Sequence, residues 1–314
     1  MKSILITGGL GFIGQNLAKK LSKKNKIIII DNLSAKKINK NFLFEKKNVK
    51  IVKCSLSNIK ILQNKLSKYK IDYVIHAAAH FANQNSIDYP EKDLKTNILG
   101  TLNILKISNK KRVQKFIYLS SSCVYSEKKS SPMQENDCIS PTETPYAISK
   151  YTAELYTKFF HEYYNLNTTI VRIFNTYGPG EISHKYRNVI PNFIYNSLRN
   201  KTIFITGNKS SYRDYTFVDD AVNLISKLLA NKNKNFQLIN SCTGKKTMII
   251  DLARKIIFYT GSKSKIKIVN KRKWDNINHR SGSIKKLKKV VKIKKYTSLE
   301  KGLLKTINWY KSII

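Results

Sequence analysis

The chain alternates between short apolar runs and longer stretches in which apolar residues recur three and four positions apart. The short runs are rich in Ile, Val and Tyr and predict strands at residues 3–7, 26–31, 49–53, 73–78, 115–120 and 168–174. The longer stretches predict helices at residues 12–24, 58–68, 91–110 and 145–164. Because strands and helices alternate, the pattern indicates βαβ units and an α/β fold with a doubly wound parallel sheet.

After residue 175 the pattern consists of shorter pieces. Further helices are expected near residues 189–199, 219–230, 248–259 and 298–312. We therefore expect a Rossmann-type, nucleotide-binding domain over residues 1–175, which also carries the catalytic residues, and a smaller, mainly substrate-binding region over residues 176–314.

The net charge of +40 is the most unusual feature of the composition. The lysines are spread from Lys2 to Lys311 and no single arm collects them, so we expect no specific nucleic-acid partner. The densest basic run, residues 283–295, is interpreted as a solvated face. The chain has no apolar run of eighteen residues or more, which predicts a protein of the cytoplasm with no membrane segment.

Four cysteines lie far apart in the sequence, at Cys54, Cys123, Cys138 and Cys242. None of them shows the CxxC spacing of a zinc site, and their scatter does not suggest a disulfide framework. The cysteines are therefore consistent with a reducing compartment, and we expect no metal.

A glycine-rich turn follows the first predicted strand. The sequence TGGLGFIG places Gly8, Gly11 and Gly14 directly before a predicted helix, as a loop that approaches a pyrophosphate requires. Asp31 ends the second strand seventeen residues after Gly14. A carboxylate there accepts hydrogen bonds from a ribose 2′-hydroxyl and repels a 2′-phosphate, so NAD is favoured over NADP.

Tyr146 and Lys150 are four residues apart within TETPYAISKY, so a helix projects both side chains from one face. A nearby ammonium favours the phenolate form of a tyrosine, which is otherwise a poor base at neutral pH. The serine cluster in YLSSSCVY, residues 118–125, falls at the carboxyl end of the fifth strand, where ligands bind in such sheets. Serine, tyrosine and lysine together form a proton-handling set.

These motifs resemble the extended short-chain dehydrogenase/reductases, in the branch of nucleotide-sugar epimerases and dehydratases. The resemblance covers essentially the whole chain. Besides the segments already quoted, it includes DNLS (31–34), VIHAAA (74–79), TNILGT (96–101), RIFNTYGPG (172–180), NVIPNF (188–193) and RDYTFVDD (213–220).

The resemblance implies NAD as cofactor, and it assigns roles to individual residues. The catalytic set is Ser121, Tyr146 and Lys150, with Ser122 as the alternative hydroxyl. The implied cofactor-binding residues are Gly8, Gly11, Phe12, Ile13, Gly14, Asp31, Asn32, Ser55, Leu56, Ala77, Ala78, Asn97, Tyr146 and Lys150. The implied substrate-binding residues are Ser121, Asn175, Asn188, Arg213 and Arg280, of which the two arginines would grip the diphosphate of a nucleotide-sugar. The helices near 91–110 and 145–164 match those that pair two subunits, which implies a homodimer.

The chain departs from the family pattern at three places. Ser55 stands where an acidic residue usually meets the adenine, and RSGS at 280–283 replaces the usual arginine-proline-glycine-aspartate. Cys123 occupies a position where some 3,5-epimerases carry a catalytic cysteine, although a packed, inert thiol is the alternative. His80 could face the substrate or pack.

The reaction type is inferred from the residues after Ser121. Dehydratases of the family place Asp-Glu there and decarboxylases use a glutamate, whereas this chain has Ser122 and Cys123. We therefore expect a nucleotide-sugar 4-epimerase that acts on a UDP-hexose or a derivative of one. The alternatives are a dehydratase, decarboxylase or 3,5-epimerase of the same family, and a non-catalytic Rossmann-type protein that binds nucleic acid.

Overall fold

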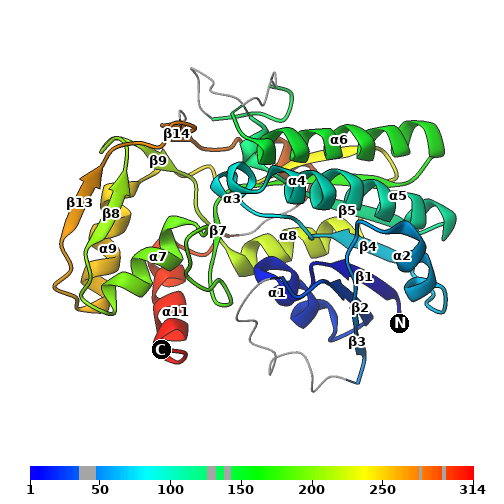
Figure 1. Ribbon diagram of the computed structural model, residues 1–314, viewed down its shortest axis with the longest axis horizontal. Coiled ribbons are helices and arrows are strands. Elements are labelled where there is room, and N and C mark those ends of the chain that lie inside the picture. The colour runs from blue at the N-terminus through cyan, green and yellow to red at the C-terminus, as the bar shows by residue number, and fades with distance from the viewer. Residues whose placement is uncertain (35–46, 126–131, 138–142, 276–277, 292–294) are drawn as a thin grey trace. The chain divides into compact units, whose positions relative to one another are not determined.

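A seven-stranded sheet organises the first part of the chain, in the strand order β11-β6-β5-β4-β1-β2-β3 (Figure 1). The computed structural model describes residues 1–34, 47–125, 132–137, 143–275, 278–291 and 295–314. The strands are β1 (Ser3–Thr7), β2 (Lys26–Asp31), β3 (Val49–Lys53), β4 (Tyr73–His76), β5 (Lys115–Ser121), β6 (Thr168–Ile173) and β11 (Gln237–Ser241). Pairing is parallel from β3 through β2, β1 and β4 to β5. The predicted doubly wound α/β fold is confirmed.

Helices cover both faces of this sheet. They are α1 (Phe12–Leu21), α2 (Ile59–Leu66), α3 (Asn83–Asp88), α4 (Pro90–Asp93), the π-helical segment η2 (Leu94–Leu99), α5 (Gly100–Lys110), the short 3₁₀ turn η3 (Ser122–Val124), α6 (Pro145–Tyr164) and α8 (Val218–Ala230). Figure 1 shows α5 and α6 along one side of the sheet, and α1 and α8 along the other. Buried residues of α2, α5 and α6, such as Leu62, Ile104 and Phe160, share one core cluster with Leu5 of β1 and Phe116 of β5. This burial of apolar surface is the main stabilisation of the sheet.

Most of the predicted elements are present, and two differences concern the large sheet and the helices that cover it. The expected helix at 91–110 is the continuous helical stretch of α4, η2 and α5, in which η2 is wound more loosely. The seventh strand, β11, was not predicted, because Leu238 and Ile239 are its only strongly apolar residues and form no run. It becomes a strand by pairing at the edge of the sheet beside β6.

The chain divides into two compact units that are discontinuous in sequence. The first contains residues 1–124, 144–172 and 222–239, and the second contains residues 125–143, 173–221 and 240–314. Residues 222–239 belong to the first unit because they contain most of α8 and of β11, and β11 is a strand of the large sheet. A single boundary after residue 175, as the sequence pattern suggested, does not capture this exchange.

Short strands and three longer helices form the second unit. Its elements are β7 (Thr176–Tyr177), α7 (Val189–Ser197), β8 (Ile203–Thr206), β9 (Tyr212–Arg213), β10 (Thr216–Phe217), β12 (Thr247–Met248), α9 (Ile249–Thr260), β13 (Ile266–Val269), β14 (His279–Arg280), α10 (Lys285–Val290) and α11 (Leu299–Lys311). Three small sheets pair β10 with β7, β13 with β8, and β12, β9 and β14 with one another.

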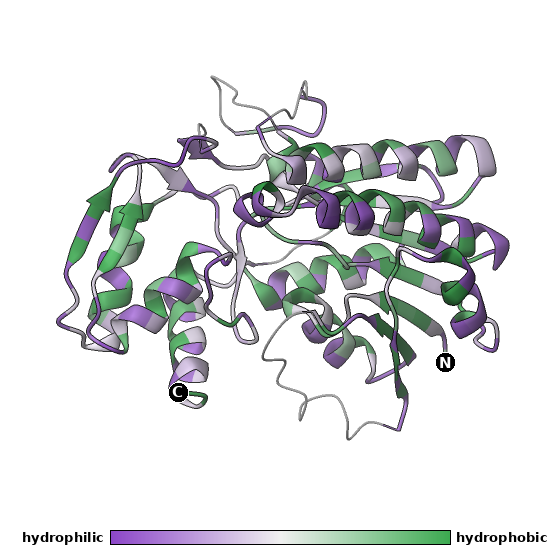
Figure 2. Ribbon diagram, viewed as in Figure 1, coloured by the Kyte–Doolittle hydropathy of each residue, from purple (hydrophilic) through white to green (hydrophobic). Residues whose placement is uncertain are grey.

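The basic helix α10 presents three of its four lysines to solvent. In α10, part of the basic run at 283–295, Leu287 is buried while Lys285, Lys288 and Lys289 are exposed; residues 292–294 lie outside the described residues. Figure 2 shows the same division, with hydrophobic strands at the centre of the sheet and hydrophilic residues on the outer turns of the helices. In the described part of the chain, no helix combines the length and apolar composition needed to cross a membrane.

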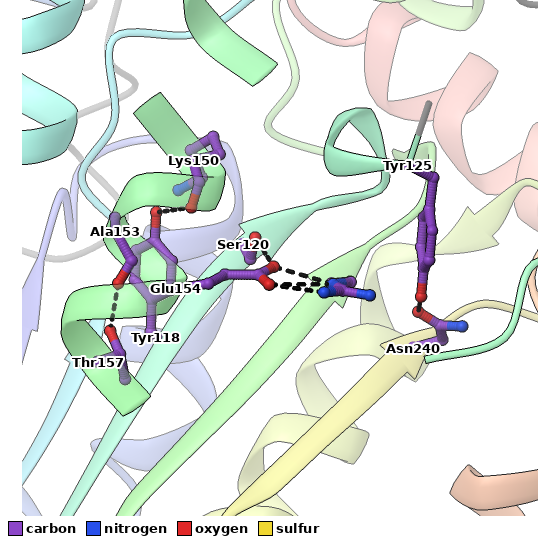
Figure 3. Close-up of polar contacts among 9 residues, drawn as sticks. Tyr118, Ser120, Tyr125, Lys150, Ala153, Glu154, Thr157 and Asn240 are labelled. Atoms are coloured by element: carbon purple, nitrogen blue, oxygen red, sulfur yellow. Dashed lines mark hydrogen bonds and ion pairs between the residues drawn. The ribbon is translucent and has the colours of Figure 1, made fainter. Parts of the chain in front are cut away.

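A buried ion pair fastens α6 to the sheet (Figure 3). Glu154 of α6 accepts hydrogen bonds from Arg172 of β6, at 2.9 Å from Nε and 2.7 Å from Nη2, and a third from the Ser120 hydroxyl of β5 at 2.5 Å. The side chains of Arg172 and Glu154 are only 2% and 5% exposed. The two charges compensate each other, and removal of either would leave the other uncompensated in the core.

We expect Glu154→Gln to lower the free energy of unfolding by about 3–5 kcal/mol, because the Arg172 charge would stay buried without a counter-ion. The matched control on the same helix is Glu162→Gln, which breaks the exposed pair with Lys158. An exposed pair of this kind contributes at most about 0.5 kcal/mol. Urea unfolding of both variants measures the difference, and equal effects would show that the buried pair has no special role in stability.

Candidate active site

The glycine-rich turn between β1 and α1 is closely packed. Gly8 has a φ of +64°, and a Cβ at this position would lie 2.6 Å from the Ala78 Cα in the loop after β4. A Cβ on Gly14 would overlap the carbonyl oxygen of Gly8. Two of the predicted glycines are therefore required by the fold itself, because neither position has room for a side chain.

The third glycine leaves the start of α1 open. Gly11 is the N-cap of α1 and supplies no side-chain cap, and the first turn contains no acidic residue. The amide groups of this turn, which include those of Phe12 and Ile13, form the positive end of the helix dipole. This arrangement suits an anion such as a pyrophosphate.

Asp31 is buried at the end of β2, and its carboxylate ties two loops together. Its Oδ2 accepts a hydrogen bond of 3.0 Å from the Leu10 amide and its Oδ1 accepts one of 2.8 Å from the Leu33 amide. Each carboxylate oxygen can accept more than one hydrogen bond, so capacity for a ribose hydroxyl remains. The next residue, Asn32, accepts a hydrogen bond from the Ser34 amide.

The other predicted cofactor positions follow neighbouring strands. Ala77 and Ala78 come directly after β4, and their amides donate to the Thr7 carbonyl and hydroxyl of β1, each at 3.2 Å. Ser55 and Leu56 follow β3, where the Ser55 hydroxyl pairs with Ser57 at 3.0 Å and Leu56 is buried. The carboxyl ends of β1, β3 and β4 thus carry the segments predicted to contact the cofactor.

Asn97 joins the loop after β4 to α6. Its Oδ1 accepts from the His80 amide at 2.8 Å, and its Nδ2 donates to Asp93 at 2.7 Å and to the Ser149 hydroxyl at 3.1 Å. The His80 ring packs edge-on against Tyr89, with centroids 6.5 Å apart. Sequence reasoning missed Asp93 and Ser149, although each is close in sequence to a predicted residue.

The predicted catalytic set lies where α6 meets the end of β5. Thr144 caps α6 by accepting a hydrogen bond from the Ala147 amide, and Pro145 occupies the first turn. Tyr146 and Lys150 are both buried, at 4% and 2% exposure. The Tyr146 phenol is hydrogen-bonded to Ser121, whose Oγ also accepts from the Cys123 amide at 3.1 Å. The structure therefore brings Ser121 and Tyr146 together as the sequence predicted, from positions 25 apart.

Burial perturbs both titratable members of this set. It raises the pKa of Tyr146 well above the usual range, with a further increase from Cys123, while the hydrogen bond from Ser121 acts in the opposite direction. Burial also lowers the pKa of Lys150 to about 7, although Asp93 and Glu154 raise it. Such perturbed groups are characteristic of functional sites.

Cys123 is half-buried, whereas Cys54 and Cys242 are buried free thiols; Cys138 lies outside the described residues. Over the described ranges of the chain, no cluster of three or more His, Cys, Asp or Glu side chains could hold a metal ion.

The two arginines predicted to bind a diphosphate are neighbours in the second unit. Arg213 of β9 and Arg280 of β14 are direct partners in a parallel strand pair. Arg213 donates to the Asn278 carbonyl at 2.8 Å and lies 3.8 Å from the Asp275 carboxylate. Like charges side by side on adjacent strands destabilise a sheet, so their pairing is consistent with an anion-binding role.

Asn175 and Asn188, the other predicted substrate residues, are also in the second unit. Asn175 donates to the Asp214 carbonyl at 3.2 Å. Asn188 begins α7 and donates to Glu181 at 3.4 Å. Glu181 is buried, which raises its pKa to about 7, and nothing in the sequence pattern had indicated it.

We expect Gly14→Ala to destabilise the protein by about 1–3 kcal/mol, because the new Cβ overlaps the Gly8 carbonyl. Gly11→Ala is the matched control, since its Cβ would lie 3.2 Å from the same oxygen. That control should lose about 1 kcal/mol or less, yet weaken NAD binding roughly tenfold or more by crowding the pyrophosphate. Thermal unfolding and calorimetric titration with NAD separate the effects; similar stability losses in both variants would contradict this interpretation.

Comparison with known proteins gives a consistent result. Residues 4–240 match the sequence profile of the NAD dependent epimerase/dehydratase family. A putative UDP-glucose 4-epimerase of Methanocaldococcus jannaschii is 33% identical over 311 residues, which cover 98% of each chain.

Solved structures agree. An epimerase from Methanothermobacter thermautotrophicus matches with a TM-score of 0.94 and 37% identity, over 99% of this chain and 92% of that one. A UDP-glucose 4-epimerase of Thermotoga maritima, solved with UDP-glucose, matches with a TM-score of 0.92 and 31% identity, over 99% of each chain.

Relatives with other activities are about as similar. A dTDP-D-glucose 4,6-dehydratase of Dictyostelium discoideum is 34% identical over 82% of this chain and 62% of its own length. A UDP-N-acetyl-alpha-D-glucosaminuronate decarboxylase of Bacillus cytotoxicus is 32% identical over 99% of this chain and 98% of its own length. Identity alone therefore does not separate the reactions.

The glycine turn, the uncapped start of α1 and the buried Asp31 fit the cofactor of this family, NAD, because they offer amides to a pyrophosphate and a carboxylate to a ribose. The parallel sheet, the paired Ser121 and Tyr146, and the profile match over most of the chain lead to one conclusion. This protein belongs to the NAD dependent epimerase/dehydratase family of nucleotide-sugar enzymes.

Proposed function

We propose that the protein is a 4-epimerase of a UDP-hexose or a UDP-hexose derivative. The observation that carries the proposal is the composition of the site around Tyr146. The phenol pairs with the Ser121 hydroxyl, and the residues that follow, Ser122 and Cys123, supply no carboxylate. Dehydration and decarboxylation require proton transfer or charge stabilisation beyond C4, whereas epimerisation at C4 requires only a proton carrier for the 4-hydroxyl.

The residues of the chain handle the proton of that hydroxyl. Bound NAD supplies a hydride acceptor and donor at C4. Tyr146 takes the 4-hydroxyl proton during oxidation and returns it during reduction, and Ser121 orients the same oxygen. Burial raises the pKa of Tyr146, so its phenolate is a strong base once formed. Lys150 lies one turn further along the same face of α6, and its ammonium would stabilise that phenolate.

Substrate binding is assigned to the second unit. Arg213 and Arg280 occupy paired positions on adjacent strands, and their permanently charged guanidinium groups match a diphosphate in charge. Asn175 and Asn188 would add amide hydrogen bonds to the nucleotide or the sugar. The UDP assignment is supported by the relatives from Methanocaldococcus jannaschii and Thermotoga maritima.

A second candidate is a dehydratase or decarboxylase, which the relatives from Dictyostelium discoideum and Bacillus cytotoxicus favour. A 3,5-epimerase would need a base for a ring carbon, and Cys123, two residues after Ser121, is the candidate for that role. Burial raises the pKa of Tyr146, and Cys123 adds to this increase.

We expect UDP-hexose incubated with the enzyme in heavy water to give an isomer of unchanged mass with no deuterium on carbon. The hydride leaves and returns without contact with solvent, and only hydroxyl protons exchange. Mass spectrometry of the purified product measures this. Loss of water with label at C6 would indicate a dehydratase, loss of carbon dioxide a decarboxylase, and deuterium at C3 or C5 a 3,5-epimerase.

We also propose that the protein is a cytoplasmic homodimer. An exposed apolar stripe runs along α6 through Ile148, Leu155, Phe159 and Tyr163, which are 44%, 51%, 46% and 69% exposed. The steps of seven, four and four residues keep these side chains on one helix face. Leu94 of the neighbouring η2 is 55% exposed, and η2 packs against α6. Paired with a second copy, these faces would form a four-helix contact.

We expect Phe159→Glu to convert the dimer to a monomer, because a carboxylate would be buried in the apolar contact. The matched control is Phe258→Glu on α9, where the aromatic ring is 80% exposed outside the stripe. Sedimentation at moderate salt should give a dimer for the natural protein and for the control, with a monomer for Phe159→Glu alone. A monomeric natural protein would refute the proposal.

A further inference from the structure

We propose that Tyr118 is a positioning residue that holds the ammonium group of Lys150 through a cation–π contact. The Lys150 Nζ lies 4.3 Å from the centre of the Tyr118 ring and donates to the Leu119 carbonyl at 2.6 Å. Lys150 and Tyr118 are both fully or almost fully buried. The effect of Tyr118 on catalysis rests on the proposed function of Lys150. The contact between the two side chains does not depend on that function.

A buried ammonium needs compensation, and the nearby carboxylates are engaged elsewhere. Glu154 is bonded to Arg172 and Ser120. Asp93 is bonded to Asn97 and to Ser149. These carboxylates act on Lys150 only from a distance, so the groups in direct contact with the ammonium are the carbonyl of Leu119 and the electron-rich face of Tyr118.

The Tyr118 ring is itself held in place by its neighbours. It stacks on His76 of β4, with centroids 5.6 Å apart and planes 28° apart. Its hydroxyl donates a long hydrogen bond of 3.5 Å to the Lys150 carbonyl (Figure 3). The ring is therefore oriented before any ligand binds.

The hydrogen bonds of His76 define its tautomer. The Thr101 hydroxyl donates to the Asn97 carbonyl at 2.6 Å, so it accepts from His76 Nε2 at 2.9 Å. The unprotonated Nδ1 then accepts from the Thr7 hydroxyl at 2.5 Å, which in turn accepts from the Ala78 amide. Burial, with a contribution from Lys150, lowers the pKa of His76 to about 3. A neutral imidazole behind Tyr118 adds no positive charge that would repel Lys150.

This arrangement leaves N–H donors of the Lys150 ammonium available for other partners. An ammonium has three donors, and the Leu119 carbonyl uses one of them. A carboxylate in direct contact would compete for the remaining donors and neutralise the charge, whereas an aromatic face stabilises the cation without accepting a conventional hydrogen bond. The other titratable neighbours of Lys150 are Tyr146 and Cys123, and the Cys123 thiolate form raises the pKa of the lysine.

A double-mutant cycle without cofactor or substrate tests the contact directly. Unfolding free energies are compared for Tyr118→Leu, Lys150→Met and the double variant at several pH values. A desolvated cation–π contact predicts a coupling of about tenfold or more in the unfolding equilibrium constant. Since Tyr118 raises the folded-state pKa of Lys150 relative to the leucine variant, the coupling should be complete below pH 6 and lost as pH rises through 7.

Two controls distinguish the cation–π contact from packing. Phe116 is a buried aromatic on the same face of β5, and Phe116→Leu combined with Lys150→Met should show no pH-dependent coupling. Tyr118→Phe should keep most of the coupling, because the ring remains. If Tyr118→Leu fails to fold, Phe and progressively fluorinated Phe at position 118 replace it, since they keep the shape while weakening the negative face.

The outcomes are distinct. Coupling that falls with fluorination and with rising pH supports the proposal, whereas coupling that is independent of pH, or equal for Phe116 and Tyr118, overturns it. In the functional assay, the same fluorinated series should lower the upper pKa of the kcat profile by up to about one pH unit relative to the Phe variant. If the enzyme turns over no UDP-sugar, that result would count against the proposed function. The double-mutant cycle would still test the contact, because it uses neither cofactor nor substrate.

Discussion

The placement of α6 on the sheet depends on one buried interaction, the ion pair between Glu154 and Arg172 with the Ser120 hydroxyl added to it. It connects three elements, α6, β6 and β5, at the level of the sheet where β5 approaches its carboxyl end. Tyr146 and Lys150 lie on the first turns of the same helix, and Ser121 is the residue after Ser120. The positions of Tyr146, Lys150 and Ser121, the proposed proton-handling set, therefore depend on a contact outside that set.

Around this anchor, the site is built mainly from neutral hydrogen-bonding groups. Asn97 connects the loop after β4 with α6, and His76 connects β1 with α5 through two threonine hydroxyls. Neutral networks cost less to bury than charges and fix the loops as firmly, provided that every member has a partner. The exceptions are Lys150 and Asp93, where burial shifts the pKa values to about 7 and about 6. Perturbed pKa values of this kind are frequent at functional sites.

The second unit follows a different principle, since its most informative feature is an unfavourable one. Arg213 and Arg280 are register partners in a parallel strand pair. The next residue, Asp214, lies between β9 and β10, is buried, and accepts hydrogen bonds from Thr243 and Gly244. The Tyr125 hydroxyl donates to Asn240 within this unit, as drawn in Figure 3. These contacts hold the short strands in place with the two arginines at paired positions, and the Asp275 carboxylate beside Arg213 offsets part of their repulsion.

Much of this protein could be predicted from its sequence, because the signals are local. The glycine turn, the strand-end Asp31 and the Tyr146–Lys150 spacing each lie within a few residues, and steric limits or helix periodicity define them. The partners of these residues were not predictable in the same way. Glu154 and Arg172, Asn97 and Ser149, and His76 and Thr101 are joined across 18, 52 and 25 residues. Strands β8, β11 and β13 were likewise missed. β11 has only two strongly apolar residues, and β8 and β13 pair with each other from positions far apart in the sequence, which no local pattern reveals. The sequence by itself determined which chemical groups are available and which helix face carries them, whereas the tertiary structure decided how those groups are buried and paired, because burial and long-range pairing set their charge states.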